Sequence, residues 1–364
     1  MRILRKLSAV LLAAVLACGI YGAPAPAAWA AEPTDEDGSA LWLRYTAIER
    51  GTYRDALASF ADSIVLGESG QVITTAAEEL QAGLASFLGE QPAIGEEPAD
   101  GGSILLGTGA NPDVAAAVGT DTLEGLGEEG YVIRRVSRGE GNMLVVAGGG
   151  EKGVLYGVFR LLEHIQCRRP LENVDLTDRP AIQWRVLDQW DNWDGSIERG
   201  YAGKSIYQWS ALPGTVDERY AAFARANASI GINTIVINNV NTQFDYLRPE
   251  NLAKVAAIAD IFRDYGIRLA LSVRFDSPIG LGGLSSADPL DESVIQWWQN
   301  KIEEIYRYIP DFAGVLVKAD SEGQPGPSQY GRTHADGANM FAKILEPHDG
   351  IVMWRTFVYG AAAA

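Results

Sequence analysis

The sequence predicts an α/β protein in which an N-terminal α+β domain is followed by an incomplete (β/α)8 TIM barrel. Beyond Pro180, apolar runs of strand length alternate with periodic runs of helix length, which is typical of parallel β/α units. Five such strands follow one another, each with polar residues at its carboxyl end, as in a barrel whose site lies at that face. A doubly wound sheet of five strands is the alternative. Only seven residues follow Phe357, too few for three further units, so we expect the barrel to be unfinished.

The predicted barrel occupies residues 173–364. Its strands are expected at Trp184 to Trp190, Thr234 to Asn239, Arg268 to Phe275, Gly314 to Ala319 and Ile351 to Phe357. Its helices are expected at Asp217 to Ile230, Pro249 to Tyr265, Asp291 to Ile309 and Ala335 to Leu345. Side chains that follow these strands should therefore gather at one mouth.

Residues 31–172 are predicted to form the separate N-terminal domain. Its strands are expected at Leu41 to Ile48, Gly130 to Val136 and Asn142 to Ala147, and its helices at Ala76 to Leu88 and Gly153 to Ile165. A glycine-rich run from Gly148 to Gly153 joins the last strand to the last helix. Backbone amides at a helix start can bind phosphate, which leaves a nucleotide-binding protein as an alternative. The spacing fits neither the dinucleotide nor the Walker motif, so we expect a tight turn packed against the sheet.

Residues 1–30 have the features of a secretory signal peptide. Basic residues precede an apolar run that begins at Leu7, and Ala28-Trp29-Ala30 supplies a cleavage site. We therefore expect a secreted protein, with lipoprotein anchoring at Cys18 as the alternative. Cleavage leaves Cys167 as the only cysteine, which excludes an intramolecular disulfide, and we expect a packed thiol.

The chain is acidic, with a formal net charge of −17. This charge disfavours nucleic acid and anionic membranes as partners. An acidic substrate would therefore need local cations in its pocket. The chain has three histidines and no cluster with metal-ligand spacing, so we expect neither a metal nor a cofactor.

Charged side chains cluster at the end of the fourth barrel strand. Lys318, Asp320 and Glu322 share one parity, and alternation along a strand would point all three to one side. The rigid Gly-Gln-Pro-Gly-Pro turn that follows would hold them. Two carboxylates and a lysine suit general acid catalysis, because one carboxyl can keep its proton while the lysine pins the other as an anion. A surface ion-pair cluster is the alternative.

The ends of the other strands have the composition of a carbohydrate site. Acids and tryptophans alternate from Asp188 through Trp190 to Trp193, and Asn239 adds an amide at the end of the second strand. Indole faces stack on sugar rings while carboxylates and amides bind hydroxyl groups. Arg355 on the fifth strand could bind a carboxylate with two parallel hydrogen bonds. Together with Lys318 it would supply the cations that an acidic sugar requires.

Several runs of the sequence resemble the glycoside hydrolase family 67 α-glucuronidases. The resemblance lies in Leu41 to Tyr45, Gly153 to Gly157, Gly195 to Ser205, Ala224 to Asn233 and Lys318 to Pro327. It implies an N-terminal α/β domain, a central (β/α)8 barrel and a C-terminal helical domain through which the full-length protein forms a homodimer. It also implies removal of 4-O-methyl-glucuronic acid, α-1,2 linked to the terminal xylose of xylo-oligosaccharides, with inversion and without metal. By this resemblance Glu322 is the general acid, and Trp190, Lys318 and Arg355 hold the uronic acid; Asp320 and Asn239 are further substrate-binding candidates.

The sequence departs from that family in one functional respect. The family's base is a pair of acidic residues on later barrel strands, which nothing in this chain matches. An inverting glycosidase needs a second carboxylate roughly 6.5 to 9.5 Å from the acid. Asp320 is too close to Glu322 in sequence to lie across the sugar ring. We therefore expect an inactive fragment, with a non-catalytic protein that binds acidic oligosaccharides as the alternative.

Overall fold

The computed structural model describes residues 37–99, 101–138 and 141–355. The predicted signal peptide, Cys18 and the last two residues of the strand expected at Ile351 to Phe357 lie outside these ranges. Residues from Tyr45 onward form one compact unit, distinct from residues 1–44. Among the described residues, none of the helices combines the length and the apolar character that crossing a membrane requires.

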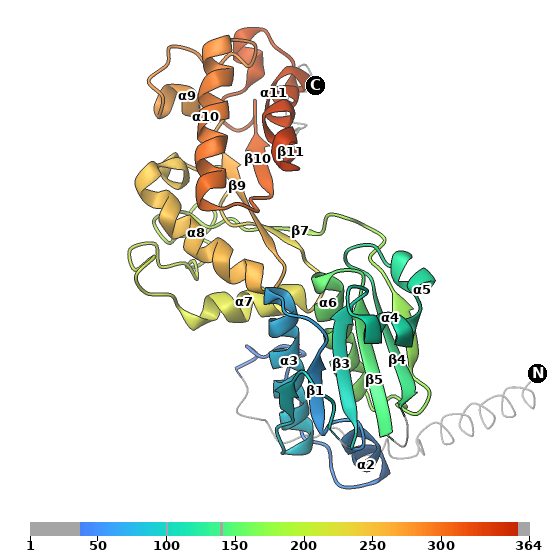
Figure 1. The fold of residues 1–364 in the computed structure, drawn as a ribbon. Helices are drawn as coiled ribbons and strands as arrows, with labels where there is room; N and C mark the ends of the chain where they lie inside the picture. The colour runs from blue at the N-terminus through green and yellow to red at the C-terminus, as the bar shows by residue number, and fades with distance from the viewer. Residues whose placement is uncertain (1–36, 100, 139–140, 356–364) are drawn as a thin grey trace, which may run out of the picture. The chain divides into compact units, whose positions relative to one another are not determined.

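The first half of the unit is built around a six-stranded mixed sheet (Figure 1). Its strands are β1 Ser63–Leu66, β2 Ala93–Gly95, β3 Ser103–Thr108, β4 Tyr131–Arg138, β5 Gly141–Gly148 and β6 Asp175–Asp178, in the order β2-β1-β3-β5-β4-β6. The neighbouring pairs from β2 to β5 are parallel, and β4 runs antiparallel to β5 and β6. The helices are α2 Thr52–Ala58, α3 Gln71–Leu88, α4 Pro112–Val118, α5 Thr120–Glu124 and α6 Glu151–Gln166.

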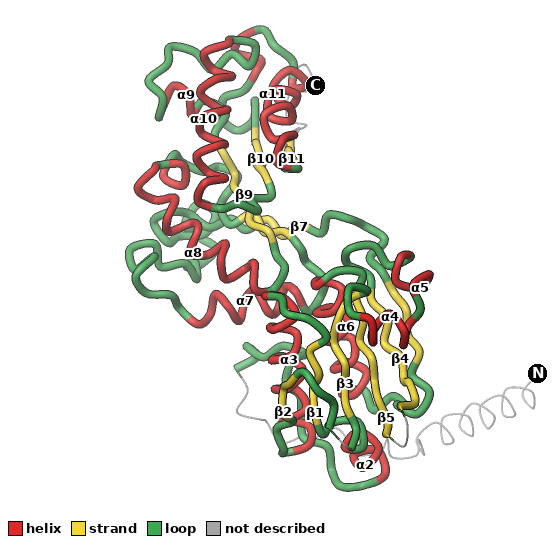
Figure 2. The backbone as a smooth tube through the Cα atoms, viewed as in Figure 1, coloured by secondary structure: helices red, strands yellow, loops and turns green. Residues whose placement is uncertain are grey.

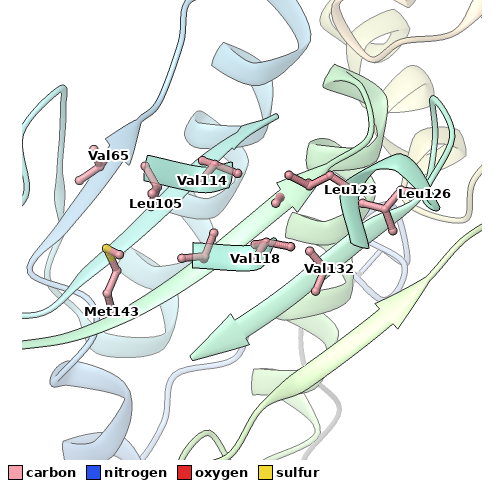
Figure 3. Close-up of a cluster of buried hydrophobic side chains, with 10 residues drawn as sticks. Val65, Leu105, Val114, Val118, Leu123, Leu126, Val132 and Met143 are labelled. Carbon is pink, nitrogen blue, oxygen red and sulfur yellow. The ribbon is translucent and has the colours of Figure 1, made fainter. Parts of the chain in front are cut away.

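Apolar side chains are buried on both faces of this sheet. The central strand β3 is buried along nearly its whole length, which is typical of a parallel strand covered on both sides. Helices α3 and α6 contact one face. On the other face, α4 and α5 enclose a cluster of ten buried residues (Figure 3): Val65, Leu105, Val114, Val118, Leu123, Leu126, Val132, Met143, Val145 and Ala147. This half of the unit therefore has a core of its own on each side of the sheet.

The glycine-rich run between β5 and α6 forms a tight turn against neighbouring backbone. A Cβ atom on Gly149 would lie 1.7 Å from the carbonyl oxygen of Gly127, and one on Gly153 would lie 2.2 Å from that of Gly130. Only glycine permits such close backbone approach. The predicted packing role is confirmed, and the run gives no support to the nucleotide-binding alternative.

Two predictions for this half of the chain are wrong. The segment from Leu41 to Ile48 forms turns and loop rather than a strand, because Leu41 and Tyr45 have φ angles of 52° and 48°. Positive φ is incompatible with the β region. Cys167 is exposed at the end of α6 and is not a packed thiol.

The second half of the unit contains a parallel five-stranded sheet (Figure 2). Its strands are β7 Val186–Asp188, β8 Thr234–Val236, β9 Arg268–Val273, β10 Gly314–Lys318 and β11 Ile351–Arg355. The helices are α7 Glu218–Ala228, α8 Pro249–Asp264, α9 Ser277–Gly280, α10 Glu292–Tyr308 and α11 His334–Leu345, with 3-10 turns at η1 Asp245–Leu247, η2 Pro327–Tyr330 and η3 Glu346–His348. The five strands and helices α7, α8, α10 and α11 overlap the ranges predicted for them, whereas α9 and the 3-10 turns were not predicted. Strands β7 to β10 end earlier than expected.

The strand order is that of a barrel segment. The strands lie in the order β11-β10-β9-β8-β7, so each is the neighbour of the one before it in the chain. A doubly wound sheet would reverse this order at a switch point. The curled sheet is therefore the first part of a (β/α)8 barrel, as predicted.

The two faces of this sheet differ in what covers them. On one face, Ile235, Val315 and Val317 are fully buried on the side of the following helices. On the other face, Val236, Val240, Ala270, Ala313 and Leu316 form a second cluster, with Val186, Trp190 and Met353 packed on it and only partly buried. Alternation along β10 puts Lys318 on the same face as Leu316. Lys318, and Arg355 paired with it, therefore extend from the inner face of the curled sheet.

Candidate active site

Strand register brings two cations together at the carboxyl edge of the sheet. Lys318 and Arg355, the last residues of β10 and β11, are direct partners in the parallel pairing. Lys318 is only 2% exposed. The Arg355 guanidinium carbon lies 5.6 Å from the centre of the Trp190 ring, a cation–π contact with the loop after β7. Lys318, Arg355 and Trp190 thus meet as predicted at one mouth of the sheet.

Glu322 joins this group through a strained turn. Glu322 and Gly323 have φ angles of 49° and 80°, and the amide of Gln324 donates to the carbonyl of Ser321, as in a type I′ turn. Lys318 Nζ donates to Glu322 Oε2 at 2.5 Å. Left-handed backbone at a residue other than glycine costs about 1–3 kcal/mol and concentrates at functional sites. The turn that places the Glu322 carboxylate beside Lys318 therefore carries backbone strain.

The electrostatics of Glu322 differ from those of a carboxyl that keeps its proton. The hydrogen bond from Lys318 and its charge lower the pKa of Glu322, and Arg199 and Arg355 lower it further. In the unliganded chain, Glu322 is the carboxylate that lysine pins as an anion. The sequence left open which of Asp320 and Glu322 the lysine pins, and the role of Glu322 as general acid stays a prediction.

Asp320 faces away from this pair. β10 ends at Lys318, and Asp320 has a φ of 51°, so alternation does not continue past the strand. Both carboxylate oxygens of Asp320 accept from Ser328, one from its amide at 3.1 Å and one from its hydroxyl. His334 Nε2 lies 4.0 Å away. The prediction that Asp320 shares the side of Lys318 and Glu322 is wrong, because the side chain closes its own turn.

The asparagines after β8 have separate tasks. Asn239 is 1% exposed, and its amide group donates to Asn192 Oδ1 at 3.1 Å and to the Glu198 carbonyl at 3.0 Å. It anchors the loop after β7, and its predicted contact with substrate stays a prediction. Asn241 accepts from Lys318 Nζ at 2.8 Å. Sequence reasoning gave Asn241 no specific role, and its position in an Asn-rich strand end was the only available indication.

The loop after β7 contributes groups that the sequence did not single out. Arg199 lies 3.4 Å from Glu322 Oε2, although 123 residues separate the two. Glu198, with a φ of 58°, keeps Oε2 buried without a hydrogen-bond partner among the described residues. No local pattern in the sequence indicates a contact of this range.

Acids and tryptophans in this loop occupy unequal environments. Burial raises the pKa of Asp188, against a hydrogen bond from Trp190 and the charge of Arg355. Burial also raises the pKa of Asp191. Trp193 stacks on Trp209 at 4.6 Å, so one of its faces is used within the protein. Of the two tryptophans in the predicted sugar subsite, Trp190 is the one at the cation pair.

Two cavities lie at opposite ends of the strands of the barrel segment. A cavity of about 350 Å³ is lined by Glu198, Asn239 and Asn241, next to the Lys318 pair. A larger cavity of about 1140 Å³ lies at the opposite strand ends, by Trp184 and Arg268. Active sites of β/α barrels lie at the carboxyl ends, the end that the smaller cavity adjoins. Of the predicted site residues, only Asn239 lines this cavity, and Asn241 connects it to Lys318. Across the part of the chain that the structure describes, His, Cys, Asp and Glu form no group of three or more that could hold a metal ion.

Family comparisons account for most of the sequence. The glycosyl hydrolase family 67 N-terminus matches residues 41–161, and the family 67 middle domain matches residues 164–364. The chain belongs to glycoside hydrolase family 67. This family 67 chain is 41% identical over 332 residues to alpha-glucuronidase A of Emericella nidulans, and 43% identical over 331 residues to alpha-glucuronidase A of Aspergillus tubingensis. Each match covers 89% of this chain and 38% of the relative, so the chain spans little more than a third of those proteins.

Solved structures share the fold of the family 67 chain at low identity. A family GH115 4-O-methyl-alpha-glucuronidase matches with a TM-score of 0.51 and 15% identity, covering 80% of this chain and 40% of that one. A family GH84 protein matches with a TM-score of 0.52 and 15% identity, covering 83% and 48%. At this identity the similarity concerns the fold alone.

Proposed function

We propose that this chain carries the sugar-binding and proton-donating part of an α-glucuronidase. The proposed substrate is (4-O-methyl-)glucuronic acid, α-1,2 linked to the terminal xylose of a xylo-oligosaccharide, and hydrolysis inverts the anomeric centre. The observation that carries the proposal is the pairing of Lys318 and Arg355 in register. In a chain of net charge −17, two adjacent cations form the local site that a uronate needs. Relatives that are named alpha-glucuronidase support the same substrate class.

Each residue of the group receives a role in this proposal. Arg355 and Lys318 bind the uronate carboxylate, Trp190 packs against the sugar, and Glu322 protonates the leaving oxygen. Inversion also requires a second carboxylate roughly 6.5 to 9.5 Å from the acid. Because Asp320 is engaged by Ser328, we place the base outside the described residues and expect no turnover from those residues alone. Export of the chain and dimerisation of the full-length protein belong to the same proposal.

Calorimetry with glucuronic acid and with neutral xylobiose tests the charge recognition. Arg355→Met should weaken glucuronic acid binding by about tenfold to a hundredfold, because a hydrogen bond between charged groups contributes roughly 1.5–3 kcal/mol. Binding of xylobiose should change little. Arg248→Met is the matched control, since it removes one surface arginine whose ion-pair partner is Asp245. Equal weakening of both ligands in Arg355→Met would show that the site does not recognise the carboxylate.

An activity assay separates this proposal from the binding-protein alternative. The ionised state of Glu322 in the unliganded chain favours that alternative, since an anion cannot donate a proton. Full-length protein that binds aldouronic oligosaccharides without releasing glucuronic acid would support a non-catalytic binder. Release of glucuronic acid supports the enzyme.

A further inference from the structure

Lys318 is held firmly, whereas the carboxylate that it contacts is not. The lysine is 2% exposed on β10, and Asn241 fixes its ammonium through a hydrogen bond of 2.8 Å. Glu322 lies in a turn instead, with 37% of its side chain exposed. Of the two partners in this ion pair, Glu322 is the one that can move away.

The charges that face Glu322 come from three elements. Lys318 and Arg355 stand at the ends of β10 and β11, and Arg199 approaches from the loop after β7. Arg199 is 62% exposed and also lies 3.5 Å from Glu198, so water and a second carboxylate weaken its effect. Arg355 also faces Asp188. Lys318 is therefore the cation that chiefly keeps Glu322 ionised.

We propose that Lys318 exchanges one ion-pair partner for another when substrate binds. The carboxylate of a bound uronate replaces Glu322 at the Lys318 ammonium, and Glu322 then takes up a proton from solvent. The inference rests on the proposed function, which places the uronate at Lys318 and Arg355. One O–H bond forms on a Glu322 carboxylate oxygen while the proton's bond to hydronium or to a buffer acid breaks, and no bond within the sugar changes.

The surrounding cations decide which carboxylate receives the proton. Two carboxylates that share one site resist being ionised together, so one of them is protonated. The uronate would hold both Lys318 and Arg355, whereas Glu322 would keep only the exposed Arg199. The proton therefore goes to Glu322, the group that must donate one during hydrolysis.

This exchange makes the acid conditional on an acidic substrate. A neutral hexose in the same position leaves the Lys318–Glu322 pair intact, and Glu322 then has no proton to give. Discrimination against neutral sugars would thus act in the chemical step as well as in binding.

Proton uptake on binding tests the inference without any turnover. Glucuronic acid is titrated into the chain in buffers of different ionisation enthalpy between about pH 4 and pH 7, at and above the ordinary carboxyl pKa values. The dependence of the heat on the buffer gives the protons taken up per ligand. We expect uptake of up to one proton per uronate near the acidic end, because free Glu322, whose pKa Lys318 lowers, is ionised there, and less toward pH 7, where liganded Glu322 is ionised as well.

Three controls make the result specific. Glu322→Gln should bind uronate several-fold more tightly, because no anion competes for Lys318, and should take up no proton. Methyl glucuronate, a neutral ester, should cause no uptake in the wild type. Arg199→Gln should keep the uptake but move it to higher pH, because one cation facing Glu322 is lost. Uronate binding without uptake, or uptake that persists in Glu322→Gln, overturns this inference alone; absence of uronate binding overturns the proposed function and the inference with it.

Discussion

Carboxylates around the candidate site fall into two electrostatic classes. Lys318 lowers the pKa of Glu322, whereas burial raises the pKa of Asp188 and Asp191. The cause is local, since Glu322 accepts from an ammonium, whereas Asp188 at the end of β7 and Asp191 in the loop after it are buried and each is supported by one neutral hydrogen-bond donor. Charge on Asp191 therefore costs stability that charge on Glu322 does not.

Asp191→Asn should stabilise the chain at neutral pH. Because the pKa of Asp191 is raised in the folded state, the folded protein binds a proton more readily than the unfolded chain does. This group therefore opposes folding increasingly as pH rises through the interval between the unfolded and folded pKa values. The asparagine should raise the Tm at pH 7 and give a smaller gain below the ordinary pKa of aspartate. A gain of the same size at both pH values would show that burial of charge is not the cause.

Sequence reasoning at this scale succeeded where a side chain belongs to a strand. Lys318 and Arg355 lie on paired strands, so their proximity follows from the β/α pattern. The prediction for Asp320 was wrong because β10 ends at Lys318, one residue before its predicted end at Ala319. The Arg199 contact could not be predicted, since it depends on the path of a loop with left-handed turns.

The turn that presents Glu322 leads into a well-capped element. Thr333 precedes α11, and its hydroxyl accepts from the amide of Asp336 at 3.2 Å. The Asp336 carboxylate in turn accepts from the amide of Thr333 at 2.8 Å, which completes a capping box. Immediately after the cap, His334 accepts from Trp354 Nε1 at 3.1 Å, which ties α11 to β11. The helix start thus fixes the end of the loop that carries the predicted acid.

Thr333→Ala should destabilise the chain by about 1 kcal/mol, since it removes one partner of an N-terminal amide of the helix. Thr333→Ser keeps the hydroxyl and is the matched control. Denaturant unfolding gives both free energies. A loss of equal size in the serine variant would mean that the methyl group, not the cap, is responsible.

Element types were predicted better than element ends. The β/α alternation is strong because each strand is apolar along its length and each helix has one apolar stripe. The end of β8 was placed too late, since the polar residues that follow it use their side chains instead of the ladder: Asn238 donates to the Ser272 carbonyl on β9, and Asn239 donates to the loop after β7. β1 and β3 were missed because their short apolar runs look the same in a strand or a buried helix.

Helices α3 and α7 are joined by an ion pair whose carboxylate is buried. Arg225 on α7 donates to both oxygens of Glu79 on α3, at 2.6 and 2.7 Å, and Tyr45 donates to the same carboxylate at 2.7 Å. The side chain of Glu79 is 6% exposed. Removing one member of such a pair leaves an uncompensated buried charge.

Arg225→Met should therefore cost about 3–5 kcal/mol of the free energy of unfolding. The double variant Arg225→Met with Glu79→Met should recover most of that loss, because neither charge of the pair is then left without its partner. Denaturant unfolding of the four proteins in the cycle measures the coupling. An equally unstable double variant would place the cost in lost packing instead.

The two sheets differ in how the pairing order of their strands relates to the order in which those strands are synthesised. In the barrel segment, every strand pairs with the one synthesised before it, so each new β/α unit finds its docking edge already in place. In the mixed sheet, β4 is synthesised before β5, yet β5 pairs with β3 and separates β4 from it. A nascent chain that ends within the glycine-rich turn after β5 is thus the shortest one able to seat β4. Translation paused before that point would leave Val132 and Ile133, both fully buried in the folded chain, without the strand beside which they pack.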